Sequence, residues 1–70
     1  MTKLLRQLGK RLRTLREERG LTQEAAADLA QLDSKHLQDM EYGRTNPTIA
    51  SLAGLAQAYD VSLSVLLEDV

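Results

Sequence analysis

Three residue types that can form a catalytic triad stand close together in this sequence, at Asp33, Ser34 and His36. A serine becomes a nucleophile when a histidine takes its proton and a carboxylate orients the histidine. Here the three residues open one predicted helix, and that arrangement does not build a nucleophile–base pair. His36 is the only histidine and the chain has no cysteine, which excludes an ordinary transition-metal site. The sequence therefore predicts no enzyme, no metal and no cofactor.

Phosphate-binding loops rich in glycine are also absent from the sequence. The four glycines are scattered, and we expect all of them at helix ends or in turns. The chemistry that remains is recognition by surface side chains.

Two short capped helices are predicted between Leu21 and Pro47. Thr22 suits the N-cap of a helix over about 23–30, and Asp33 suits the N-cap of another over about 34–42. Because only a few residues separate these helices, they must cross at a steep angle. The second helix then lies on the surface, where it can enter a DNA major groove.

Three further helices are predicted around this pair. Leucines recur at spacings of three and four on a helix over about 4–19, which Gly20 ends. Thr48 caps a helix over about 49–59, and Ser62 caps a last one over about 63–68. The inner stripe of the fourth helix is expected to hold Ile49, Leu52, Leu55, Ala56 and Tyr59.

Charge is distributed unevenly along the 70 residues, although the net charge is only −1. Residues 1–19 hold seven of the nine lysines and arginines and two acids, a local charge of +5. Residues 20–70 hold two basic and eight acidic residues, a local charge of −6. The basic segment is either a surface for a partner such as nucleic acid or a solvated helix face.

The chain resembles the lambda-repressor-like helix-turn-helix domains, of the Cro or xenobiotic-response-element type. The similarity runs without gaps from about Leu8 to Glu68. The matching positions are Leu12, Leu15, Arg16, Gly20 to Glu24, Ala27, Leu37, Met40, Glu41, Gly43, Asn46, Pro47 and Val61 to Leu63. The resemblance implies that residues 1–70 form a single all-α domain, compact and five-helical, with the helix-turn-helix in its second and third helices.

Two features depart from the family pattern. The turn inside the helix-turn-helix usually holds a glycine with positive φ, and here Gln31 stands there at a cost of about 1 kcal/mol. Ala26 and Ala30 stand where the family has larger aliphatic residues. We therefore expect a less filled core, or one in which Leu29 or a partner supplies the bulk.

The resemblance also implies which side chains contact DNA. Base contacts are implied for Ser34, Lys35, Gln38 and Asp39. Phosphate contacts are implied for Thr22, Gln23, Tyr42, Arg44, Thr45 and Asn46. The alternative for the base-contacting residues is a solvated helix face, and it weighs most for Asp39, because phosphates repel a carboxylate.

Arg16 and Glu41 resemble the family's structural ion pair, which joins the first helix to the end of the reading helix. A guanidinium and a carboxylate can pair through two hydrogen bonds and so fix the angle of that helix. The alternative is an ordinary surface pair worth ~0–1 kcal/mol.

These features predict a sequence-specific transcriptional regulator that binds a palindromic operator in double-stranded DNA as a homodimer. Two subunits are needed because one domain reads too few base pairs to select a genomic site. We expect the dimer interface on the last helix and the end of the fourth, with closure of the core as the alternative. Its residues are Val61, Leu63, Val65, Leu66, Leu67 and Val70.

A second hypothesis is a protein-interaction module that keeps the fold without binding DNA. The acidic balance after Gly20 and the carboxylate of Asp39 favour it. Under either hypothesis we expect a cytoplasmic protein of bacterial or phage type, nucleoid-associated if it binds DNA. No apolar run approaches the ~18 residues of a membrane span, and no small-molecule ligand is evident.

Overall fold

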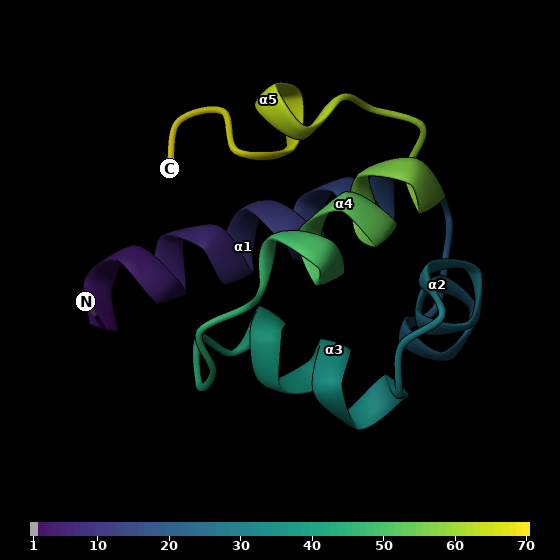
Figure 1. Ribbon diagram of the computed structural model, residues 1–70, viewed down its shortest axis with the longest axis horizontal. Helices are drawn as coiled ribbons and strands as arrows, with labels where there is room; N and C mark the ends of the chain where they lie inside the picture. Colours follow the sequence, from purple (N-terminus) through teal and green to yellow (C-terminus); the bar gives the residue numbers. More distant parts are fainter. Residues whose placement is uncertain (1) are drawn as a thin grey trace.

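The computed structural model describes residues 2–70, which fold into five helices and contain no strand (Figure 1). The helices are α1 (Thr2–Glu18), α2 (Gln23–Ala30), α3 (Ser34–Glu41), α4 (Ile49–Ala58) and α5 (Leu63–Leu66). The all-α, five-helix prediction is confirmed. The bounds differ by one or two residues, and α5 is shorter than predicted because Leu67 to Asp69 form a turn that ends at a left-handed residue.

Hydroxyl side chains cap three of the helices as predicted. Thr22, Thr48 and Ser62 accept hydrogen bonds from the backbone N–H three residues further on, in the first turns of α2, α4 and α5. The prediction for Asp33 is wrong in part. Asp33 occupies the N-cap position of α3, but its side chain makes no capping hydrogen bond, because the exposed carboxylate is solvated by water instead.

The turn between α2 and α3 depends on a left-handed residue. Gln31 has φ 59° and ψ 42°, as predicted for the position where the family usually has glycine. Its N–H and that of Leu32 donate to carbonyl groups at the end of α2, with Leu32 N 2.8 Å from Ala27 O. These backbone bonds close α2 and direct the chain into α3.

The core lies between α1 and the layer formed by the other helices. Its buried residues are Leu8, Leu12, Leu15, Ala26, Ala27, Leu37, Met40, Leu52, Leu55, Ala56, Tyr59 and Leu66. The prediction that Ile49 joins them is wrong, because this side chain is 66% exposed. Helical periodicity places Ile49 on the inner face of α4, but the helices that cover Leu52 do not extend to the first turn.

Small residues bring α2 and α4 close together, which explains one departure from the family pattern. A Cβ added to Gly54 would lie 3.0 Å from the carbonyl oxygen of Ala30. Leu29 is 61% exposed and supplies no bulk to the core. The alanine at position 30 therefore accompanies a close helix contact and not a loosely filled core.

Gly9 allows α1 to cross the end of α3 at very short range. A Cβ on Gly9 would overlap the carbonyl oxygen of Glu41 and lie 2.7 Å from that of Met40. The expectation that every glycine marks a helix end or a turn is wrong for Gly9 and Gly54. Both lie inside helices, because two backbones approach each other there.

Replacing Gly9 by alanine is expected to lower the free energy of unfolding by about 1–3 kcal/mol. In an unobstructed helix the same change stabilises by about 0.5–1 kcal/mol, so the sign of the effect reports the α1–α3 contact. Urea unfolding followed by circular dichroism measures it, with Thr14→Ala on the exposed face of α1 as the control. A Gly9→Ala protein as stable as the parent would contradict this close packing.

Candidate nucleic-acid interface

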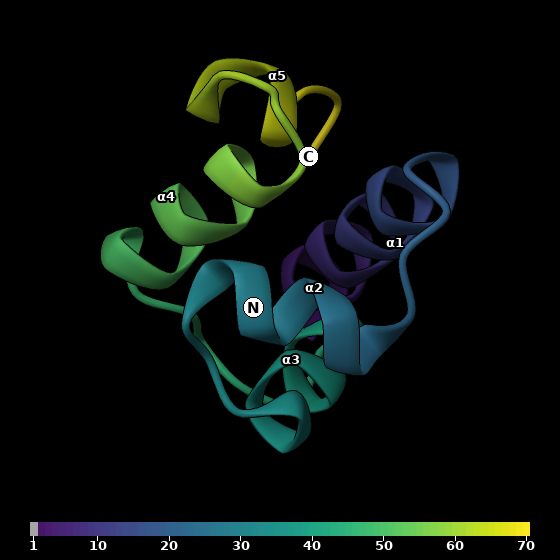
Figure 2. The same ribbon diagram turned by 90° about the vertical axis from the view of Figure 1, so that its right-hand side faces the viewer.

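The helix-turn-helix presents α3 along one edge of the molecule, below α1 in Figure 1 and below α2 in Figure 2. Ser34, Lys35 and Gln38 are exposed along α3, and Asp39 is half-buried. Leu37 and Met40 point into the core on the opposite face. The structure thus brings the four predicted base-contacting residues together on one outward row.

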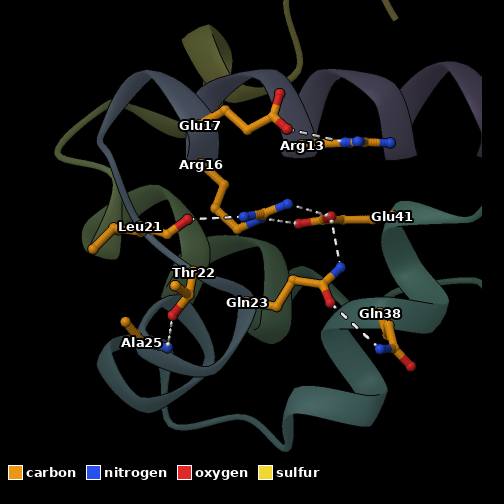
Figure 3. Close-up of polar contacts among 9 residues, drawn as sticks. All are labelled: Arg13, Arg16, Glu17, Leu21, Thr22, Gln23, Ala25, Gln38 and Glu41. Atoms are coloured by element: carbon orange, nitrogen blue, oxygen red, sulfur yellow. Dashed lines mark hydrogen bonds and ion pairs between the residues drawn. The ribbon is translucent and has the colours of Figure 1, made fainter.

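An ion pair between α1 and α3 fixes the position of this row (Figure 3). Arg16 Nε donates to Glu41 Oε2 at 2.7 Å and Arg16 Nη2 to Glu41 Oε1 at 3.2 Å. The two side chains are only 11% and 3% exposed. Arg16 Nη1 also donates to the carbonyl oxygen of Leu21 at 2.8 Å, directly before α2. One guanidinium therefore ties α1 to both helices of the helix-turn-helix.

The hydrogen bond from Arg16 to Glu41 raises the pKa of the guanidinium above its ordinary value, although burial acts in the opposite direction. Burial also raises the pKa of the Tyr59 phenol, which lies in the core near this pair. Both groups keep their ordinary protonation states through the physiological range. The ion pair is consequently a permanent element of the fold in that range.

Gln23 connects the ion pair to the reading row, a role that the sequence did not predict. Its side-chain Nε2 donates to Glu41 Oε1 at 3.0 Å, and its Oε1 accepts from Gln38 Nε2 at 3.4 Å (Figure 3). Gln23 was predicted to contact phosphate through the start of α2. Its side chain is instead held between Glu41 and Gln38, while its backbone N–H stands in the first turn of α2.

Asp39 stands between the two cations of the reading surface. Lys35 Nζ and Arg44 Nε each lie 3.8 Å from one of its carboxylate oxygens. The guanidinium of Arg44 also stacks over the ring of Tyr42, 4.5 Å from the ring centre. Asp39 is therefore positioned to balance the charge of both cations.

The other predicted phosphate-contacting residues lie around α3. Thr22 caps α2, and Tyr42, Arg44 and Asn46 are exposed after α3, whereas Thr45 is half-buried. A recess of 250 Å³ brings Gln23 and Tyr42 together with Arg13. Arg13 was not predicted as a site residue, although the basic character of the first helix gave a signal for it.

The predicted dimer interface is only partly open to a partner. Val65 and Val70 are each 37% exposed, and Val61, Leu63 and Leu67 are half-buried against the core. The assignment of Leu66 to this interface is wrong. Leu66 has no exposed surface, because α5 folds back and inserts this side chain into the core of its own subunit.

No group of three or more histidine, cysteine, aspartate or glutamate side chains within residues 2–70 is arranged to hold a metal ion. In the same part of the chain, every helix is too short or too polar to cross a membrane.

Comparison with known proteins identifies the fold family. A family model described as a helix-turn-helix domain matches residues 7–68. The chain belongs to the lambda-repressor-like helix-turn-helix family. Among curated proteins, this domain is 46% identical over 63 residues to the HTH-type transcriptional regulator DdrOP3 of Deinococcus deserti. It is 35% identical over 60 residues to the immunity repressor protein of Bacillus phage phi105.

These matches cover 90% and 86% of the chain but only 49% and 42% of the two relatives. A solved structure matches at nearly full length on both sides, the restriction-modification controller protein C.AhdI from Aeromonas hydrophila. It has a TM-score of 0.87 and 35% identity, over 94% of this helix-turn-helix domain and 98% of that chain. These proteins are named as regulators, a repressor and a controller and not as enzymes, which supports a non-enzymatic role.

Proposed function

We propose that this helix-turn-helix protein is a sequence-specific DNA-binding transcriptional regulator that binds a palindromic operator as a homodimer. The observation that carries the proposal is the exposed row on α3, held at a fixed angle by the buried Arg16–Glu41 pair. Fixed polar side chains on a protruding helix are what direct readout in a major groove needs. The regulators and repressors among its relatives support the same function.

Base recognition is assigned to three exposed side chains of α3. Lys35 donates to guanine, Gln38 pairs with adenine through its amide, and Ser34 bonds either a base or a phosphate. Asp39 accepts from cytosine or excludes wrong sequences. Because Gln23 holds the amide of Gln38, this readout begins from an ordered side chain.

Phosphate contacts are assigned to both flanks of α3. The first backbone N–H groups of α2, at Gln23 and beside Thr22, face an anion with the positive end of the helix dipole. Tyr42, Arg44, Thr45 and Asn46 serve the other flank, where only Arg44 carries a full charge. Contacts of this kind set the register of the protein on DNA without reading its sequence.

The homodimer is assigned to α5 and the end of α4, through the residues that remain accessible there. α5 and α3 lie at opposite edges of the molecule in Figures 1 and 2, so a contact through α5 leaves α3 uncovered. Val65 and Val70 offer exposed apolar surface, and Val61 and Leu63 line a neighbouring hollow of 520 Å³. An isologous contact of this surface pairs two reading helices on two half-sites.

Replacing Val65 by aspartate is expected to convert the dimer into a folded monomer. The change puts a charge into the centre of the proposed interface, where it is desolvated without a partner. Sedimentation equilibrium measures the dissociation constant, which is expected to rise by about tenfold or more. Ser64→Asp, which adds the same charge to an exposed neighbour, is the control. An unchanged dimer in Val65→Asp would remove α5 from the interface.

We further propose a cytoplasmic, nucleoid-associated location in a bacterial or phage-type setting, which follows from DNA as the partner.

A second candidate function is a protein-interaction module that keeps the fold without binding DNA. The observation in its favour is the position of Asp39, 3.8 Å from both cations of the reading surface. These contacts leave Lys35 and Arg44 with less charge to offer to phosphates. A partner protein with polar groups would then fit the same row.

Titration of labelled duplex DNA at several salt concentrations separates the two functions. A DNA-binding regulator loses affinity linearly in a plot of log K against log salt, with a slope of about −0.9 for each phosphate contacted. A protein-interaction module shows no such duplex binding at low salt. Absence of salt-dependent binding would reject the regulator and favour the second candidate.

A further inference from the structure

The reading surface holds too little positive charge for a protein that binds a polyanion. Residues 33–46 contain two cations, Lys35 and Arg44, and three carboxylates. Glu41 is neutralised by Arg16, and Asp39 stands beside both cations. Because phosphate neutralisation supplies most of the nonspecific binding energy, the missing cations must come from another element.

α1 is the element that carries them. It contains six lysines and arginines and no acid before Glu17. Two of the six act within the fold, since Arg16 pairs with Glu41 and Arg11 Nη2 donates to the carbonyl of Val65 at 2.8 Å. The other four are exposed. Three of these, Arg6, Lys10 and Arg13, follow at spacings of four and three and so share one helix face, here named the α1 basic stripe.

The stripe is continuous with the proposed DNA surface at two points. Arg6 packs against the turn after α3, where a Cβ added to Gly43 would lie 2.9 Å from Arg6 Cγ. Gly43 has φ 72° and directly precedes Arg44. Two helical turns along α1, Arg13 lines the same recess as Gln23 and Tyr42. The stripe therefore borders both groups of residues assigned to phosphates, over about 10 Å of helix axis.

We propose that the α1 basic stripe is a further phosphate-binding edge, on which the DNA backbone beside the half-site rests. The proposal extends the DNA-binding function proposed above and depends on it. Charge complementarity identifies the occupant, because the stripe adds three cations next to a reading surface that lacks them. Glu17 Oε2 lies 3.2 Å from Arg13 Nε, but both side chains are more than half exposed, and a phosphate can replace so weak a pair.

The test measures salt-dependent binding of the full chain to its selected duplex and to a duplex pool of random sequence. Arg6→Gln, Lys10→Gln and Arg13→Gln are each expected to reduce the salt slope by about 1 per subunit. The loss of affinity is expected to be equal for both duplexes, so that the specificity ratio is unchanged. Glu17→Gln, which releases Arg13, is expected to strengthen binding to both.

Arg19→Gln is the matched control, since it removes one exposed cation beyond the end of α1 and outside the stripe. An unchanged slope in the three stripe variants, with a parent protein that binds its duplex, would overturn the stripe and leave the proposed function intact. An equal loss in Arg19→Gln would also overturn it, because the effect would then be one of total charge. A parent protein that binds neither duplex would remove both proposals together.

Discussion

Glu41→Ala is expected to destabilise the protein by about 3–5 kcal/mol, the range found when one partner of a buried ion pair is removed. The alanine leaves the guanidinium of Arg16 in a site where it is 11% exposed and without its carboxylate. It also removes the acceptor of the Gln23 amide. For a domain of this length the total stability is about 4–10 kcal/mol, so this single change brings the chain near the unfolding threshold.

Thermal unfolding followed by circular dichroism measures this effect, with an expected fall in Tm of more than about 10 °C. The matched control is Glu17→Ala, which breaks the exposed Arg13–Glu17 pair and is expected to change stability by less than about 1 kcal/mol. A second variant tests the reason for the loss. Arg16→Met combined with Glu41→Leu replaces the pair by apolar groups and is expected to lose less than Glu41→Ala alone. Equal stability of Glu41→Ala and Glu17→Ala would show that the pair contributes nothing.

Lys35→Ala combined with Gln38→Ala is expected to abolish operator preference while leaving the fold intact. Each side chain contributes about 1–3 kcal/mol of discrimination between bases, so the pair accounts for a preference of about 30-fold or more. Both side chains are exposed, and neither contributes to the core. Competition between the selected duplex and a random duplex measures the preference directly.

The control for this variant is Thr14→Ala combined with Arg19→Ala, which removes one charge and one polar group outside α2 and α3. It is expected to keep the operator preference and the helical content of the parent. If the Lys35 and Gln38 variant still selects the same site, the assignment of the reading row to α3 is wrong.

Local signals were sufficient to predict the elements of the fold. The leucine spacing in α1, the hydroxyl caps and the positions of Gly20 and Gly43 each depend on residues close in sequence, and the structure agrees with them. The errors arose where distant segments meet. Gly9 and Gly54 were expected in turns, because nothing in their own neighbourhood shows that another backbone crosses there.

The candidate site shows the same limit. The sequence predicted the outward row on α3 from the order of its residues, since periodicity decides which side chains share a face. It did not predict the bond from Gln23 to Glu41, because the two residues are separated by 18 positions and meet only when α2 and α3 cross. Leu66 was misassigned for a related reason. Periodicity does not tell whether an apolar residue on a short helix faces its own core or a partner.

Selection of duplexes from a random DNA library, followed by sequencing of the bound pool, tests the central claim most directly. The account predicts enrichment of an inverted repeat whose half-sites are about one helical turn apart, as expected for two α3 helices related by a two-fold axis. A bound pool that remains random at moderate salt would contradict sequence-specific DNA binding by this protein.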